Sequence, residues 1–155
     1  MTQERKQFQR TEDGHLLLMS NEERNLLITD LTARLNYGVI CLIERVDDFG
    51  PIQRDEKLTG FSSDDRGEFY FEVGGGLAIS FAEKIMPYLR PMSSMTEEEF
   101  KEYHSMLIDV DNSGLMNQTL ITKIVDWLDK KMFDHRNLIP KRLALEAPEE
   151  MYKFN

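Results

Sequence analysis

Apolar residues near the start of the chain recur at the spacing of a helix. Three leucines follow one another every four residues, at Leu27, Leu31 and Leu35. Ser20 and Glu23 form a capping box in front of them, in which each side chain bonds the other residue's free backbone N–H. Gly38 suits the left-handed residue that ends a helix. This pattern predicts a helix over residues 20–37.

The pattern then changes to short apolar segments separated by turn residues. Val39–Val46 is rich in β-branched residues, and its nearly continuous apolar start predicts a strand that is buried on both faces. Glu68–Val73 alternates between apolar and polar positions, which predicts a strand with one face toward a core. Further strands are expected at residues 52–61, 77–81 and 88–90, with one helical turn at residues 82–86. Short strands joined by tight turns predict a small SH3-like barrel.

The second half of the chain has helical periodicity. Thr96 and Glu99 form another capping box, and Met95 with Phe100 suits the hydrophobic staple that accompanies such a box. We expect one helix from Thr96 to about residue 108 and another over about residues 118–132. The predicted apolar stripe of the first helix consists of Phe100, Tyr103, Met106 and Leu107.

Together these elements predict an α+β protein of one domain. Residues 1–14 are polar and aperiodic, which predicts a flexible tail. Residues 15–92 are expected to hold the helix and the small β-barrel. Residues 93–155 are expected to form a helical segment that packs on the barrel.

Charge and cysteine content narrow the classes of function. The chain has 155 residues and a net charge of −9, which argues against nucleic acid as a partner because phosphate binding needs a surplus of Lys and Arg. Cys41 is the single cysteine, so no internal disulfide forms and a reducing compartment is expected. No signal peptide or membrane span is visible, and we expect a soluble, cytoplasmic protein.

One segment resembles part of a calcium loop. Asp109, Asp111 and Ser113 occupy the first, third and fifth positions of an EF-hand pattern, and Gly114 occupies the sixth. The twelfth position is Leu120, where the motif needs a bidentate glutamate. We therefore favour a helix–helix connection made of turn-forming residues, and expect no metal ion and no cofactor.

Catalytic motifs are incomplete in this sequence. The histidines are far apart, and Asp134–His135 is half of a catalytic pair that lacks an identifiable nucleophile. Gly74–Gly76 lies between two predicted strands and is not followed by the lysine of a phosphate-binding loop. We lean against an enzyme, and a small metal-dependent hydrolase is the third interpretation of this chain.

Recognition of another protein is the first interpretation. The predicted loops of the barrel carry two acidic pairs, and Tyr70 lies on the strand face opposite Phe69 and Phe71. The candidate contact residues are Tyr70, Asp47, Asp48, Asp64 and Asp65. Their charge predicts a basic partner surface and an association that salt weakens.

Three segments also resemble a known group of sequences: residues 30–39 (DLTARLNYGV), residues 88–98 (YLRPMSSMTEE) and parts of residues 126–149. They resemble small uncharacterised proteins of gut bacteria of the Bacteroides type and of their phages and prophages. This group brings no known activity, cofactor or catalytic residue. The resemblance implies an accessory protein of a phage or mobile element. Together with the first interpretation, this predicts a non-enzymatic binding module that acts on a host factor; the alternative is a phage structural or assembly component.

Overall fold

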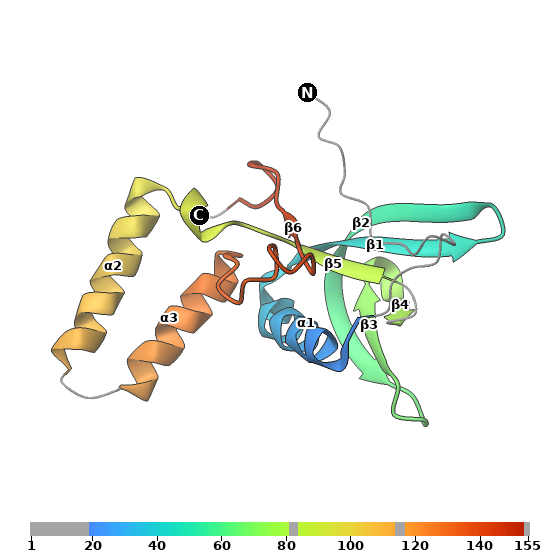
Figure 1. Ribbon diagram of the computed structural model, residues 1–155, viewed down its shortest axis with the longest axis horizontal. Coiled ribbons are helices and arrows are strands. Elements are labelled where there is room, and N and C mark those ends of the chain that lie inside the picture. The colour runs from blue at the N-terminus through green and yellow to red at the C-terminus, as the bar shows by residue number, and fades with distance from the viewer. Residues whose placement is uncertain (1–18, 81–83, 114–116, 154–155) are drawn as a thin grey trace.

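The computed structural model describes residues 19–80, 84–113 and 117–153. Within these residues the chain is an α+β protein with three α-helices and a six-stranded mixed sheet (Figure 1). The helices are α1 (Asn21–Arg34), α2 (Glu97–Asn112) and α3 (Gln118–Lys130). The strands are β1 (Ile40–Asp47), β2 (Gly50–Ser63), β3 (Phe69–Val73), β4 (Leu77–Ser80), β5 (Lys84–Leu89) and β6 (Leu145–Glu146).

Helix α1 begins where the sequence predicts, and together with a following 3₁₀ turn it reaches the predicted end. The Ser20 side chain accepts a hydrogen bond from the Glu23 backbone N–H, and the Glu23 carboxylate accepts one from the Ser20 N–H, each at 3.2 Å. After Arg34 one 3₁₀ turn, Leu35–Tyr37, leads to Gly38, whose φ of 74° is the left-handed value expected of it.

The strand order is β4-β3-β2-β1-β5-β6, with only the β5–β6 pair parallel. Strand β2 is longer than predicted, because its first half pairs with β1 and its second half with β3. The change occurs at an irregularity between Leu58 and Gly60, where the strand passes from one neighbour to the other. No ladder joins β4 to β5 among the described strands, so this sheet is open and a closed SH3-like barrel is not confirmed.

The predicted helical turn at residues 82–86 is wrong where it is described, since Lys84–Met86 belongs to β5. Residues 81–83 lie outside the described residues. Pro87 follows this segment and pairs with Cys41 of β1. It is tolerated because β6 pairs only with Tyr88 and Leu89, so at Pro87 strand β5 is an edge of the described sheet.

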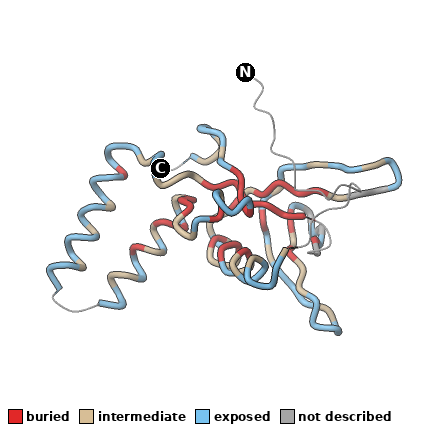
Figure 2. Tube along the Cα trace, viewed as in Figure 1, coloured by how far each residue is buried: buried red, intermediate tan, exposed pale blue. Residues whose placement is uncertain are grey.

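Two apolar clusters cover the two faces of the sheet. Cys41 and Ile43 of β1 pack in the larger cluster with Leu27 and Leu31 of α1, while Leu42 packs on the opposite face. That second face is covered by the C-terminal segment, which Figure 2 shows crossing over the buried strands. The prediction of burial on both faces is confirmed over Cys41–Glu44 of β1, where all four side chains are buried.

Helix α2 runs further than predicted. Asp109–Asn112 is helical, so the predicted loop at residues 109–114 is wrong over these four residues, while Gly114 lies outside the described residues. Asp and Asn are poor helix formers, but the turn is held because Val110 packs against α3. The predicted stripe is wrong at two positions: Tyr103 and Met106 face α3, whereas Phe100 and Leu107 are exposed.

The capping box at the start of α2 is confirmed. Thr96 Oγ1 accepts a hydrogen bond from the Glu99 N–H at 3.1 Å, and Glu99 Oε1 accepts one from the Thr96 N–H at 3.0 Å.

Thr96→Ala is expected to lower the free energy of unfolding by about 1 kcal/mol, because one N–H at the helix start loses its acceptor. Urea denaturation of both proteins measures this, and an unchanged midpoint would contradict the role of Thr96.

Candidate functional site

The two acidic pairs predicted to form one contact surface lie apart. Asp47 and Asp48 are at the turn between β1 and β2, whereas Asp64 and Asp65 follow the last residue of β2. A strand of 14 residues covers about 40 Å when straight. Figure 1 shows the two turns at different ends of the bent strand, so the acidic pairs do not form one surface.

Asp64 and Tyr70 instead hold the turn between β2 and β3. The Asp64 carboxylate accepts hydrogen bonds from the backbone N–H groups of Arg66 and Glu68 and from the Tyr70 hydroxyl, each at 2.9 Å. The hydrogen bond from the Glu68 backbone leads the effects that lower the pKa of Asp64. Tyr70 is half-buried, and its hydroxyl is bound within the hairpin. Asp48 and Asp65 are exposed, and both remain candidate contacts.

The partial calcium motif is helical over its first four residues, Asp109–Asn112. Asp109 and Asp111 lie two positions apart on α2, which points their side chains to nearly opposite sides of the helix. Ser113 caps the helix end, where its hydroxyl donates to the Val110 carbonyl at 2.7 Å. These three candidate ligands therefore do not converge on one point.

The structure reveals a buried ionic cluster that sequence reasoning missed. Its members are Asp30, Arg34, Asp129, His135 and Arg136. Arg34 is fully buried and binds both carboxylate oxygens of Asp30 at 3.0 Å. Arg136 bridges the two acids at 2.8 Å from each, and His135 Nε2 lies 2.7 Å from Asp129. One feature of the sequence could have indicated this cluster: Asp30 and Arg34 share the helix face of Leu27 and Leu31, which is expected to be buried.

The local fold at the end of α3 brings backbone acceptors to Arg34. Met132 adopts φ 63°, while the Phe133 N–H bonds the Leu128 carbonyl at 2.9 Å and the Met132 N–H bonds the Asp129 carbonyl at 3.1 Å. This is a Schellman ending with methionine in the position that glycine usually takes, at a cost of roughly 1–2 kcal/mol. It directs the Phe133 carbonyl to Arg34 Nη2 at 2.6 Å.

The ionic cluster has the features of a structural site. Burial raises the pKa of Asp129, but hydrogen bonds from His135 and Arg136 and the charges of both arginines outweigh it and lower the pKa to about 2. The Asp129 carboxylate is therefore ionised, and both of its oxygens are hydrogen-bonded. His135 contacts Asp129, while the Asp134 carboxylate accepts a hydrogen bond from the Leu138 backbone N–H at 2.7 Å. These two neighbouring residues therefore engage different partners.

A pocket of about 810 Å³ lies between the start of α2, the β5–β6 edge and the C-terminal segment. Its polar groups are held by neighbouring parts of the fold. The Ser94 hydroxyl donates to the Pro91 carbonyl at 2.6 Å, Thr96 caps α2, and the Tyr88 hydroxyl donates to Asp55 at 2.7 Å. These three hydroxyls are therefore engaged in hydrogen bonds within the fold.

Apolar side chains are exposed together on one face of α2. Phe100 is 57% exposed, Leu107 is 37% exposed and Ile108 is 43% exposed. The His104 ring stacks on Phe100 at a centroid distance of 5.9 Å. We call Phe100, His104, Leu107 and Ile108 the exposed α2 face; their spacing places them on one side of a helix.

A different side of α2 packs against α3. Tyr103 stacks on Trp127 of α3 at a centroid distance of 6.0 Å, and Met106 and Val110 pack in the same cluster. Figure 1 shows α2 and α3 as a hairpin that projects from the sheet, and Figure 2 shows that α2 is exposed along most of its length. The exposed α2 face is therefore on a different side of the helix from the side that packs against α3.

Among the helices of the described residues, none has the length and apolar character to cross a membrane. Comparison of the chain with known protein families, with characterised proteins and with solved structures finds no match in any of the three. The exposed and buried side chains of this chain are therefore the basis for its proposed function.

Proposed function

We propose that this protein is a non-enzymatic protein-binding module and that the exposed α2 face is its contact surface. The observation that carries this proposal is the grouping of apolar side chains. Six large apolar residues are exposed among the described residues, and three of them, Phe100, Leu107 and Ile108, lie on one face of one helix. Exposed apolar side chains that gather in this way are typical of protein interaction sites.

Two further features support a binding function. The hydroxyls of the described pocket are held by the fold, and the buried ionic cluster has its charges paired. The proposal moves the contact surface from the sheet loops to α2, because Asp64 and Tyr70 are bound to each other within their turn.

The sequence resemblance supplies the proposed setting, which is an accessory protein of a phage or mobile element that binds a host protein. The sheet is proposed as an open relative of the small SH3-like barrel, since β2 is shared between two strand pairs that continue into one bent sheet. It would serve as the scaffold from which the helical hairpin projects.

Capture from a host lysate tests the proposal with two matched isoleucines. Ile108 on α2 is 43% exposed and Ile52 on β2 is 38% exposed, so either change to serine removes a similar exposed apolar side chain. Ile108→Ser is expected to reduce the recovered partner at least about tenfold, and Ile52→Ser to leave it unchanged. Quantitative mass spectrometry of the captured proteins measures both.

Two results would contradict this proposal. One is equal recovery by wild type and Ile108→Ser. The other is turnover of a substrate by the isolated protein. Recovery from purified virions in place of host proteins would favour the structural or assembly function over action on a host factor.

A further inference from the structure

The pocket between the start of α2 and the C-terminal segment has an unequal charge. Its volume of about 810 Å³ falls in the range of cavities that enclose a small ligand. Three acids line it, Asp55, Glu146 and Glu149, whereas Arg90 is the one basic residue among the described residues of its lining. The charge of these residues therefore indicates what kind of ligand the pocket would take.

The charge of Arg90 is neutralised within the fold. Its guanidinium donates to both carboxylate oxygens of Glu99, at 2.6 and 2.9 Å, and to the Lys131 carbonyl at 3.2 Å. The same group lies 4.2 Å from the centroid of the Phe133 ring. An anionic ligand would have to compete with Glu99 for these donors, so an anion is not the expected occupant.

Two of the acids have no such partner. Glu146 and Glu149 are exposed, and neither forms an ion pair with another residue in the described part of the chain. Asp55 accepts a hydrogen bond from the neutral Tyr88 hydroxyl at 2.7 Å. Within the described ranges, no three acidic, histidine or cysteine side chains are arranged to hold a metal ion. The negative charge is therefore spread around the pocket, which favours an organic cation over a metal ion.

Apolar side chains line the pocket beside these acids. They are Pro91, Leu145, Ala147, Pro148 and Met151. Lysine and arginine side chains pack their methylene groups against such surfaces, while their charged ends stay close to carboxylates and water. A lining of this mixed kind therefore suits a basic group on an aliphatic chain.

We infer that this pocket binds an ammonium or guanidinium group at the end of an aliphatic chain, as in the side chain of lysine or arginine. The cation lies near Glu149, and the aliphatic chain contacts Met151. This chemistry can come from a side chain of a peptide or from a free diamine. None of the described residues that line the pocket belongs to the exposed α2 face, so this inference does not depend on the proposed function.

Titration of the full chain with three peptides and a diamine tests the ligand chemistry. The first peptide is Ala-Ala-Lys-Ala-Ala with blocked ends, the second has norleucine in place of lysine, and the third has glutamate there; the diamine is cadaverine. NMR signals of labelled methionine methyl groups report the location, because Met151 lines the pocket and Met106 packs between α2 and α3. We expect the lysine peptide to shift the Met151 signal, with a Kd at least about fivefold lower than that of either other peptide, and to leave Met106 unchanged.

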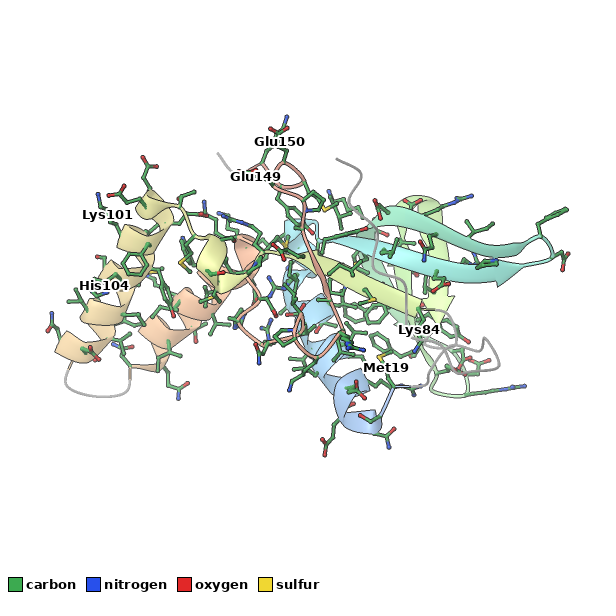
Figure 3. All side chains as sticks on the ribbon, turned by 45° about the horizontal axis from the view of Figure 1, so that its top comes forward. Met19, Lys84, Lys101, His104, Glu149 and Glu150 are labelled. Atoms are coloured by element: carbon green, nitrogen blue, oxygen red, sulfur yellow. The ribbon has the colours of Figure 1, made fainter. Side chains whose placement is uncertain are left out.

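Two neighbouring acids give a matched pair of variants. Glu149 and Glu150 are both exposed on the turn of the C-terminal segment that Figure 3 shows, but Glu149 lines the pocket and Glu150 does not. Each change to glutamine removes one negative charge. Glu149→Gln is expected to raise the Kd of the lysine peptide about fivefold, and Glu150→Gln to leave it nearly unchanged at about 0.15 M salt. Equal urea midpoints establish that both variants are folded.

The response to cadaverine separates the two sources of the ligand. A shift of Met151 as strong as that caused by the lysine peptide assigns the site to free amines, and a weaker shift assigns it to peptide side chains; both results support the inferred chemistry. Equal binding of the lysine and norleucine peptides would remove the charge argument, and tighter binding of the glutamate peptide would assign the pocket to anions through Arg90. Equal effects of the two variants, or no shift of Met151 with any probe, would overturn the site.

Discussion

Arg34→Met is expected to lower the free energy of unfolding by about 3–5 kcal/mol. The guanidinium of Arg34 is fully buried and neutralises Asp30, which is also fully buried. Methionine has a similar length but no charge, so the change leaves part of the negative charge of Asp30 and Asp129 uncompensated away from water. Arg136 contacts both acids, but its one charge cannot balance two.

The chain supplies a matched control for this experiment. Lys101 and Glu97 are also four residues apart on a helix, but their side chains are 72% and 84% exposed. Lys101→Met is expected to change the free energy of unfolding by less than about 0.5 kcal/mol, because exposed pairs of this kind contribute little. Urea denaturation at pH 7 measures both variants. Similar shifts for Arg34 and Lys101 would contradict the importance of the ionic cluster.

Acidification is expected to lower the free energy of unfolding, because two buried carboxylates, Glu99 and Asp129, become protonated. Burial raises the pKa of Glu99, but hydrogen bonds from Arg90 and the Thr96 backbone outweigh it and lower the pKa from 4.5 to about 2. Asp129 is lowered from 3.8 to about 2. A carboxylate with a lowered pKa in the folded state stabilises the protein above its unfolded pKa and loses that contribution as pH falls. We expect losses of about 3 kcal/mol from Glu99 and about 2 kcal/mol from Asp129 between about pH 5 and pH 2.

Glu99→Gln separates the contribution of Glu99 from that of other carboxylates. Glu99 binds Arg90 with both oxygens, at 2.6 and 2.9 Å, so the variant is expected to be less stable at pH 7. It is also expected to lose less stability on acidification, since one titrating group is gone. Glu98→Gln is the control because Glu98 is exposed on the same turn. Parallel curves of urea midpoint against pH for wild type and Glu99→Gln would contradict this assignment.

Local elements were predictable where the interactions that form them join residues close in the sequence. Both capping boxes form within four consecutive residues, and Gly38 adopts the left-handed conformation that ends the first helical segment. The burial of β1 on both faces was also predictable from the sequence, because the apolar residues at its start are nearly continuous. The α+β class followed from these elements.

Other features depend on contacts between distant parts of the chain. Strand β6 has only two residues, Leu145 and Glu146, and exists because they pair with Tyr88 and Leu89. Two residues carry no periodicity from which a strand could be predicted. The ionic cluster likewise joins α1 to residues about a hundred positions away, so its pairing was not visible in sequence.

The sequence by itself determined where helices start, which strand lies in the core, and that acidic side chains outnumber basic ones. It did not determine which side of α2 is covered, because two apolar arcs on that helix suit a core equally well. The tertiary structure decided this by placing α3 against Tyr103 and Met106, which leaves Phe100, Leu107 and Ile108 exposed. The physical reason is that amphipathic periodicity specifies a face of a helix, whereas burial depends on which partner packs against that face.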